Sequence, residues 1–356
     1  MKLNKKLTGL LIMIIIAFQL SAQNDECNFN KSFAVRKGTA LNLSNKFGDI
    51  SFITGKNDSL KICTVITIIQ DNETLRNKNI KLININIENQ KDTISISTQY
   101  DKNFFSESLR EGRKSFTVDY LITLPAYMDL RVTDEFGNIS IEELDGALKV
   151  RLVHGNLNVK KLTRGNAKPL NSVYIDHGKA DIDELNWITM AVYNCPSVNI
   201  DRAQAVMLTS VISKIIMGNI SSIVTNSKSD SYKIQSISNM IAECTYSEIE
   251  IGRLNSQLKS KNTYGSLTVA DLGKDFNSMD IASNHSQISL TTGQKASFSA
   301  DIIATDSQVE FPAAKFPGII QTNNNYSTAL LGIAGTDKQT RSSLKIRATG
   351  GKVKMQ

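Results

Sequence analysis

A short phrase recurs along this chain at nearly even intervals. It reads FGNIS at residues 136–140, HGNLN at 154–158, YSEIE at 246–250 and YGSLT at 264–268, and successive copies start 17 to 23 residues apart. The copies begin at Phe136, His154, His177, Cys195, Ile212, Ser229, Tyr246, Tyr264, His285 and Asp306. One unit of this length cannot bury its own apolar side, so the repeat predicts a stack of units that share one core.

The fourth and sixth residues of each copy are apolar or aromatic, as in Ile139 with Ile141 and Ala180 with Ile182. Two residues is the period of a β-strand, so both side chains point to the same side of a sheet. Apolar residues do not recur at three and four residues, as an amphipathic helix would need. Each unit is therefore predicted to hold two strands joined by a corner at the phrase.

The predicted fold is all-β, a single-stack parallel β-solenoid (β-helix) with backbone hydrogen bonds between layers about 4.8 Å apart. We expect the coil to be right-handed, from the general chirality of parallel crossover connections. Glycines at the second position of several copies, including Gly137 and Gly155, are expected to permit unusual φ angles at the corner.

Residues 1–23 read as a signal peptide. Lys2, Lys5 and Lys6 precede an apolar run of signal-peptide length, and cleavage is expected after Ala22 or Gln23. The alternative is an uncleaved membrane anchor. Since no second long apolar run follows, we expect a mature chain that does not span the membrane, exported to the periplasm or the cell surface.

The remainder of the chain divides into three predicted parts. Residues 24–130 form an irregular, β-rich N-terminal part of the solenoid, with a polar loop at 101–115. The regular repeats fill 131–311, and the tail 312–356 contributes strands expected to finish the stack and cap its open end, because a bare sheet edge is adhesive.

The charge and the cysteines say less about the fold and the function. The formal net charge is +7, and the Lys and Arg residues are scattered without a dense basic tract, so nucleic acid is not an expected partner. The four cysteines are far apart and show no metal-binding spacing; we expect buried free thiols, although an exported protein can form disulfides. They are Cys27, Cys63, Cys195 and Cys244.

The first position of the phrase predicts a ladder of rings along one corner of the stack. By the parity of the preceding strand these side chains are expected to face inward. The predicted ladder residues are Phe136, His154, His177, Tyr246, Tyr264 and His285. His154 and His177 fall on adjacent layers, where two imidazoles could bind a transition metal. No third ligand is evident, so stacking is the preferred interpretation and no metal site or cofactor is predicted.

A candidate binding site lies at Asp181, Asp183 and Asp201, which are expected to share one outer face on neighbouring layers. Stacked carboxylates repel each other unless a cation or a proton lies between them. A calcium site or the acidic groove of a polysaccharide-cleaving β-helix enzyme would show this pattern. Because Lys179 and Arg202 are near in sequence, a solvated charged face is the simpler interpretation.

Three segments resemble a known family. NKFGDI at 45–50, the Leu-Pro pair at 124–125 and FGNI at 136–139 look like the motifs of the bacterial putative adhesin family, whose members are exported β-strand-repeat proteins. The family is a domain of unknown function. The resemblance covers most of the mature chain and implies a solenoid fold and an exported location. It supplies no catalytic residues.

The sequence thus favours a non-enzymatic scaffold or binding module of the cell envelope, whose partner is an envelope, glycan or protein surface. Motifs for a serine hydrolase, a zinc protease, a phosphate-binding loop and a dinucleotide fold are all missing from the sequence. The alternative is a carbohydrate-active β-helix enzyme, a polysaccharide lyase or a glycosidase. A third possibility is an envelope structural protein that polymerises end to end.

Overall fold

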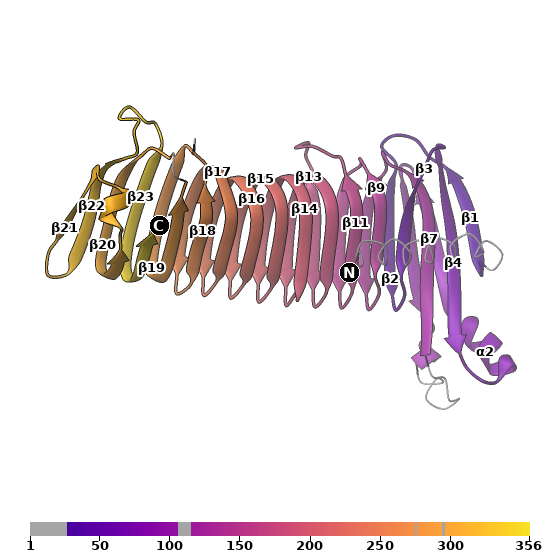
Figure 1. Cartoon of the computed structure of the whole chain (residues 1–356). Coiled ribbons are helices and arrows are strands. Elements are labelled where there is room, and N and C mark those ends of the chain that lie inside the picture. The colour runs from indigo at the N-terminus through magenta and orange to yellow at the C-terminus, as the bar shows by residue number, and fades with distance from the viewer. Residues whose placement is uncertain (1–26, 106–114, 275, 294–295) are drawn as a thin grey trace, which may run out of the picture.

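A computed structural model describes residues 27–105, 115–274, 276–293 and 296–356. The predicted signal peptide at 1–23 and residues 106–114 of the predicted polar loop lie outside these ranges. Strands account for 71% of the structure and belong to one 23-stranded sheet. Figure 1 shows them stacked as a long column, with β4, β7 and α2 projecting at its N-terminal end.

The N-terminal part contains seven strands and a short helix. Their bounds are β1 (Phe29–Ala34), β2 (Ala40–Lys46), β3 (Ile50–Gly55), β4 (Ser59–Ile69), α2 (Glu73–Ile80), β5 (Ile83–Gln90), β6 (Thr93–Tyr100) and β7 (Ser115–Pro125). The pairs β1–β4, β4–β7 and β5–β6 are antiparallel, whereas β2 and β3 pair in parallel with later strands. The sequence did not predict α2, which begins after Asn72, whose side chain accepts a hydrogen bond from the Leu75 amide at 3.1 Å.

The repeats form the column. Their strands are β8 (Asp129–Glu135), β9 (Ile139–Leu144), β10 (Leu148–Val153), β11 (Asn156–Leu162), β12 (Asn171–Asp176), β13 (Lys179–Tyr193), β14 (Ser197–Val211), β15 (Lys214–Lys228), β16 (Ser231–Thr245), β17 (Glu248–Thr263), β18 (Ser266–Leu272), β19 (Ser278–Thr292) and β20 (Phe298–Glu310). The tail adds η1 (Ala313–Lys315), β21 (Ile319–Asn323), β22 (Ser327–Ala334) and β23 (Ser343–Met355).

Consecutive layers pair in parallel and in register, which is the arrangement of a β-solenoid. Ile141 pairs with Val159, which pairs with Ile182, which pairs with Ile200. All four side chains are buried, so they form one file through the core. The apolar alternation in the sequence predicts this file, because a shift of one residue would turn each of these side chains to solvent.

From β13 to β17, each layer is a single strand that bends from one face of the column to the other, whereas the earlier layers are built from two strands. In β14, alternation slips at Asp201 and Arg202, which are both exposed, and again at Ala205 and Val206, which are both buried. These slips turn the chain from one side of the column to the other. We call the sheet built from the first halves face A (156–162, 179–185, 197–203, 214–220, 231–237 and 248–254) and that built from the second halves face B (148–153, 171–176, 188–193, 206–211, 223–228, 240–245 and 258–263).

The corner from face B to the next layer's face A has one constant feature, a residue with positive φ. Its φ is 62° at Phe136, 56° at His154 and 57° at His177. The sequence placed the unusual backbone at the glycines that follow, and this was wrong: Gly137 and Gly155 are not in the left-handed region. These glycines serve close approach instead, because a Cβ on Gly155 would overlap the carbonyl oxygen of Gly137 one layer below.

The C-terminal end of the column is assembled out of chain order. β23 lies between β19 and β20 and pairs in parallel with both, so Ile346 faces Ile281 on one side and Ile302 on the other. Among the described residues, β22 and β21 are the strands that continue the sheet beyond β20, and both pairings are antiparallel. The last strand of the predicted cap is therefore an inserted layer, and β21 and β22 occupy the end.

The cysteines divide into two kinds. Cys195 and Cys244 are buried free thiols, as predicted. Cys27 and Cys63 instead form a disulfide, with their Cα atoms 5.5 Å apart. The expectation of four free thiols was wrong because β1 returns antiparallel to β4, and this pairing brings Cys27, just before β1, beside β4.

The corner glycines generate a stability prediction. Gly155→Ala should lower the free energy of unfolding by about 2 kcal/mol or more, because its Cβ meets backbone that cannot move without separating two layers. Gly165→Ala is the control, since no atom lies within 4 Å of its Cβ position. Urea unfolding followed by circular dichroism measures both changes. Equal midpoints for the two variants would contradict the close-approach role.

Candidate functional site

The predicted ring ladder exists as two separate stacks at the positive-φ corner. In the first, Phe136 stacks on His154 with ring centroids 5.0 Å apart and an interplanar angle of 10°, and His154 lies 4.9 Å from His177. In the second, Tyr246 lies 5.3 Å from Tyr264, which lies 5.3 Å from His285. Asn194, Ile212 and Ser229 occupy the corner between the two stacks.

Both stacks point to solvent, which corrects the inward orientation expected from strand parity. Phe136, His154, His177, Tyr246, Tyr264 and His285 are all exposed. A left-handed residue turns its side chain outward and leaves the next residue facing the interior. The following residue is accordingly small, as at Gly178 or the buried Ser247. Cys195 was aligned with this corner, but the positive φ belongs to Asn194, and Cys195 is the buried residue after it.

The two adjacent histidines have a carboxylate beside them. His177 Nδ1 lies 2.8 Å from Asp176 Oδ1, and both side chains are at least partly exposed. Within the residues that the structure describes, no three His, Cys, Asp or Glu side chains are placed to hold a metal ion together. The geometry at this corner is that of stacked rings with one carboxylate within hydrogen-bond distance of His177.

The predicted acidic site lies on face A. Asp181 and Asp201 line a shallow hollow of about 690 Å³ together with Asn199, whereas Asp183 is exposed but does not line it. The Asn199 amide donates to Asp181 Oδ1 at 2.5 Å. On the same face Arg202 pairs with Glu184 at 3.0 Å. The structure therefore brings two of the three predicted aspartates into one hollow, within a face where donors and cations accompany the acids.

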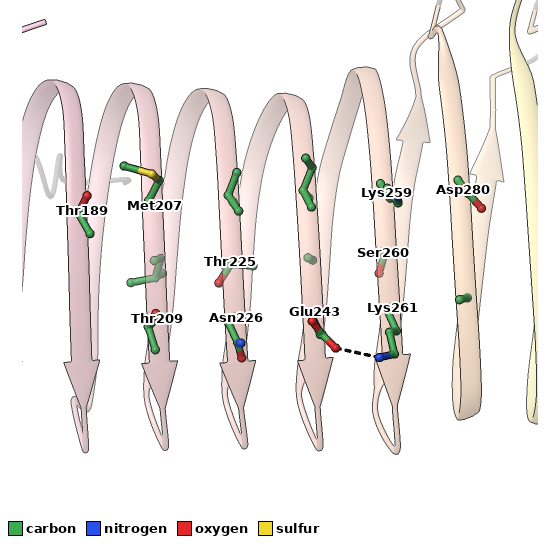
Figure 2. A pocket seen from close by; sticks show the side chains of 15 residues that line it. Thr189, Met207, Thr209, Thr225, Asn226, Glu243, Lys259, Ser260, Lys261 and Asp280 are labelled. Atoms are coloured by element: carbon green, nitrogen blue, oxygen red, sulfur yellow. Dashed lines mark hydrogen bonds and ion pairs between the residues drawn. The ribbon is translucent and has the colours of Figure 1, made fainter. Parts of the chain in front are cut away.

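Face B carries a feature that sequence reasoning missed. Met207, Val224 and Ile241 are register partners on three successive layers, and they are 36%, 49% and 53% exposed. They line a trough of about 620 Å³, shown in Figure 2, that extends from Thr189 at one end past Lys259 to Asp280 at the other. The available signal was a pair of adjacent apolar residues in each strand, VM at 206–207, IV at 223–224 and MI at 240–241, where alternation requires a polar residue.

A polar row runs beside this apolar row. Thr209, Asn226, Glu243 and Lys261 face one another across successive layers, and Lys261 Nζ lies 2.9 Å from Glu243 Oε1 (Figure 2). The carboxylate of Glu243 raises the pKa of Lys261 through this hydrogen bond. The trough thus combines an exposed apolar strip with a fixed polar border, as binding surfaces commonly do.

One buried acid lies below the first ring stack. Asp134 on β8 is completely buried, and neither of its carboxylate oxygens has a hydrogen-bond partner in the described part of the chain. Burial raises the pKa of Asp134 to about 7. Such a carboxyl is costly to ionise, because burial removes the water around its charge and weak contacts with the Asn45 side chain and the Glu135 backbone only partly offset that loss.

Comparison with known proteins gives limited information. No protein-family model and no curated protein matches the chain. Three similar solved structures are described as a putative adhesin from Parabacteroides distasonis (8% identity, 92% of this chain and 96% of that chain, TM-score 0.32), a putative adhesin from Parabacteroides merdae (11%, 94% and 97%, 0.33) and a putative cell adhesion protein from Clostridium sporogenes (12%, 92% and 99%, 0.18).

These descriptions agree with the resemblance that the sequence motifs indicated. With identities and TM-scores this low, the three structures carry no function over to this chain. Separately, none of the helices in the ranges described is long and apolar enough to cross a membrane.

Asp134 generates a pH-dependent prediction. Its folded-state pKa of about 7 lies above the ordinary value of 3.8, so the stability it contributes is full below about pH 4 and is lost as the pH rises to about 7. Asp134→Asn should therefore stabilise the protein by roughly 2 to 4 kcal/mol at pH 8 and much less at pH 4. Chemical unfolding at the two pH values measures this difference.

The exposed Asp183→Asn variant is the control and should change stability little at either pH. If Asp134→Asn changes stability equally at pH 4 and pH 8, in either direction, the folded-state pKa of Asp134 is not raised.

Proposed function

We propose that this chain is an exported, non-enzymatic binding module of the cell envelope, and that it contacts its partner through face B. The observation that carries this proposal is the row Met207, Val224 and Ile241. The column fixes these side chains side by side on an open sheet, where 36% to 53% of each remains exposed. Apolar residues exposed together, with a polar border, are typical of surfaces that another molecule covers.

The binding free energy expected from this row fits a weak but specific contact. Full burial of a Val or Ile side chain contributes about 1.5 to 3 kcal/mol, and these residues are already about half buried, so each adds on the order of 1 kcal/mol to binding. Neighbouring layers present further contacts along the same face. Because the affinity is spread over many layers, it suits an extended partner, which is an envelope, glycan or protein surface.

Export has two supports. The first is the basic and apolar pattern of residues 1–23. The second is the Cys27–Cys63 disulfide, because disulfides form and persist mainly in oxidising compartments outside the cytosol. We also propose a right-handed coil, on the general chirality of parallel crossovers.

A carbohydrate-active enzyme is the second candidate, and the hollow on face A favours it. Asp181, Asp201 and Glu250 line that hollow together with Lys233, which lies 4.0 Å from Glu250. Convergent carboxylates with a cation are what a lyase or a glycosidase would need. We prefer the binding module because the Asn199 amide already donates to Asp181, so this carboxylate is engaged within the protein.

The test is binding of the mature protein to a glycan array and to purified bacterial envelope fragments. The double variant Val224→Asp/Ile241→Asp should bind at least about tenfold more weakly, a loss of about 1.4 kcal/mol. Ile212→Asp is the matched control, because Ile212 is 60% exposed on the same layers but at the corner. This control should bind like the wild type.

Two results would overturn the proposal. One is unchanged binding by the Val224→Asp/Ile241→Asp variant at an unchanged melting temperature. The other is release of unsaturated or shortened products when the purified protein is incubated with acidic polysaccharides, which would establish the enzyme instead.

A further inference from the structure

A second hollow on the same sheet surface as face B has a different chemistry. It has a volume of about 550 Å³ and crosses β5, β6, β2, β8 and β10 near the N-terminal end of the column. Arg131, Lys149 and Arg151 are the cations among its lining residues, and all three are exposed. Hydroxyl and amide side chains provide much of the rest: Asn42, Ser44, Asn86, Ser95, Ser97 and Thr133.

The cations face one another. Arg131 and Lys149 are direct register partners on β8 and β10, and Arg151 is two residues along β10 on the same side. Like charges directly opposite each other in a sheet are destabilising. Elsewhere in the described column a cation repeatedly faces a carboxylate one layer away, as in the pairs Lys46–Glu135, Lys161–Glu143, Arg202–Glu184, Lys233–Glu250 and Lys261–Glu243.

No such compensation is present at this hollow. Within the part of the chain that the structure covers, none of the three cations has a carboxylate within the 4.0 Å of an ion pair. The acid that lines the hollow is Glu88, whose oxygens accept hydrogen bonds from the Asn86 and Gln90 amides at 3.3 Å. The folded chain therefore holds a repulsive cluster that an external anion would relieve.

Aromatic rings lie beside the cations. The Arg151 guanidinium lies 4.5 Å from the centroid of the Tyr174 ring, and the Tyr174 and Tyr193 rings are 5.6 Å apart on the next two layers. Both tyrosines are partly exposed. The guanidinium is thus held by the ring while its N–H groups can still donate to a planar anion.

We propose that this hollow binds a segment of an acidic polysaccharide, a chain of sugar rings bearing carboxylate or sulfate groups. Arg131, Lys149 and Arg151 would pair with the anionic groups, with Arg suited to bidentate contact. The serines and asparagines match sugar hydroxyls, and the tyrosines provide amphipathic rings with an apolar face and a polar tip. An anionic lipid surface fits less well, because the apolar lining residues Leu43, Ile96 and Val132 are buried.

This site is separate from the apolar row, although the two are aligned. Lys149, Ser172, Thr189 and Met207 pair in succession along one line, so three layer spacings, about 14 Å, separate the cationic hollow from the row. Binding at the cationic hollow does not depend on the proposed role of Met207, Val224 and Ile241. Either proposal can fail while the other holds.

The experiment titrates the mature protein with polygalacturonate and with heparin, and compares them with neutral dextran. The wild type should bind at least one of the two acidic polymers, more weakly as salt is raised, and should not bind dextran. Arg131→Gln/Lys149→Gln should reduce this affinity at least tenfold. Its melting temperature without polymer should be unchanged or higher, because a repulsion is removed. The carboxylated and sulfated polymers distinguish the two kinds of anion.

Lys179→Gln/Lys214→Gln is the matched control, because it removes the same charge from exposed residues of face A. It should retain wild-type binding. Equal loss of polysaccharide affinity in both double variants would show that binding depends only on net charge, and it would overturn the proposed site. Binding of single-stranded DNA or of phosphatidylglycerol vesicles as tightly as the polysaccharide would also overturn it. Tyr174→Ala provides a second reading and should weaken polysaccharide binding without removing a charge.

Discussion

The backbone contact between successive corners is the constraint on which this structure depends. At most corners the positive-φ residue donates its N–H to a carbonyl one layer away, as in His154 to Asp176 at 2.9 Å and Tyr246 to Thr263 at 2.9 Å. The following residue then lies so close to the corner below that Gly137, Gly155 and Gly178 have no room for a side chain. Register is thereby fixed at one point in each of these layers, and the strands on both sides must follow.

Once register is fixed, the outer surface becomes a set of straight rows. A residue type repeated at one position of the sequence is repeated along one line of the column, about 4.8 Å apart. The ring stacks, the acid-base pairs of face A, the apolar row and the cationic hollow are all such rows. Their chemistry can vary without changing the core, because these side chains face outward while the inward residues form the core.

The interior also contains acids, and their surroundings differ. Asp230 is buried, but its oxygens accept hydrogen bonds from Ser210 Oγ and Ser227 Oγ, each at 2.7 Å, and from the Ser213 amide at 2.7 Å. Asp134 is also buried, but in the described part of the chain its oxygens have only weak contacts, with the Asn45 side chain and the Glu135 backbone. The first arrangement strengthens the corner it occupies in the middle of the column. The second makes the stability of the first repeats depend on pH.

The sequence predicts the core file of Ile141, Val159 and Ile182 because two-residue alternation directly specifies which side chains face inward. It could not predict that Phe136 and its equivalents face outward, since strand parity fails at a residue with positive φ. The Cys27–Cys63 disulfide and the insertion of β23 depend on contacts between distant segments, which local pattern does not contain. Of the binding surfaces, the sequence indicated the Asp181 face but not the cations of Arg131 and Lys149, which lie 18 residues apart and meet only through the register.

The most direct test of this account is cross-linking between layers. Thr209 and Asn226 are register partners with exposed side chains, so Thr209→Cys/Asn226→Cys should form a disulfide under mild oxidation. Thr209→Cys/Lys228→Cys, offset by two residues, should not. Mass spectrometry of the oxidised proteins reports the bond. Cross-linking in the offset pair, or in neither pair, would contradict an in-register column.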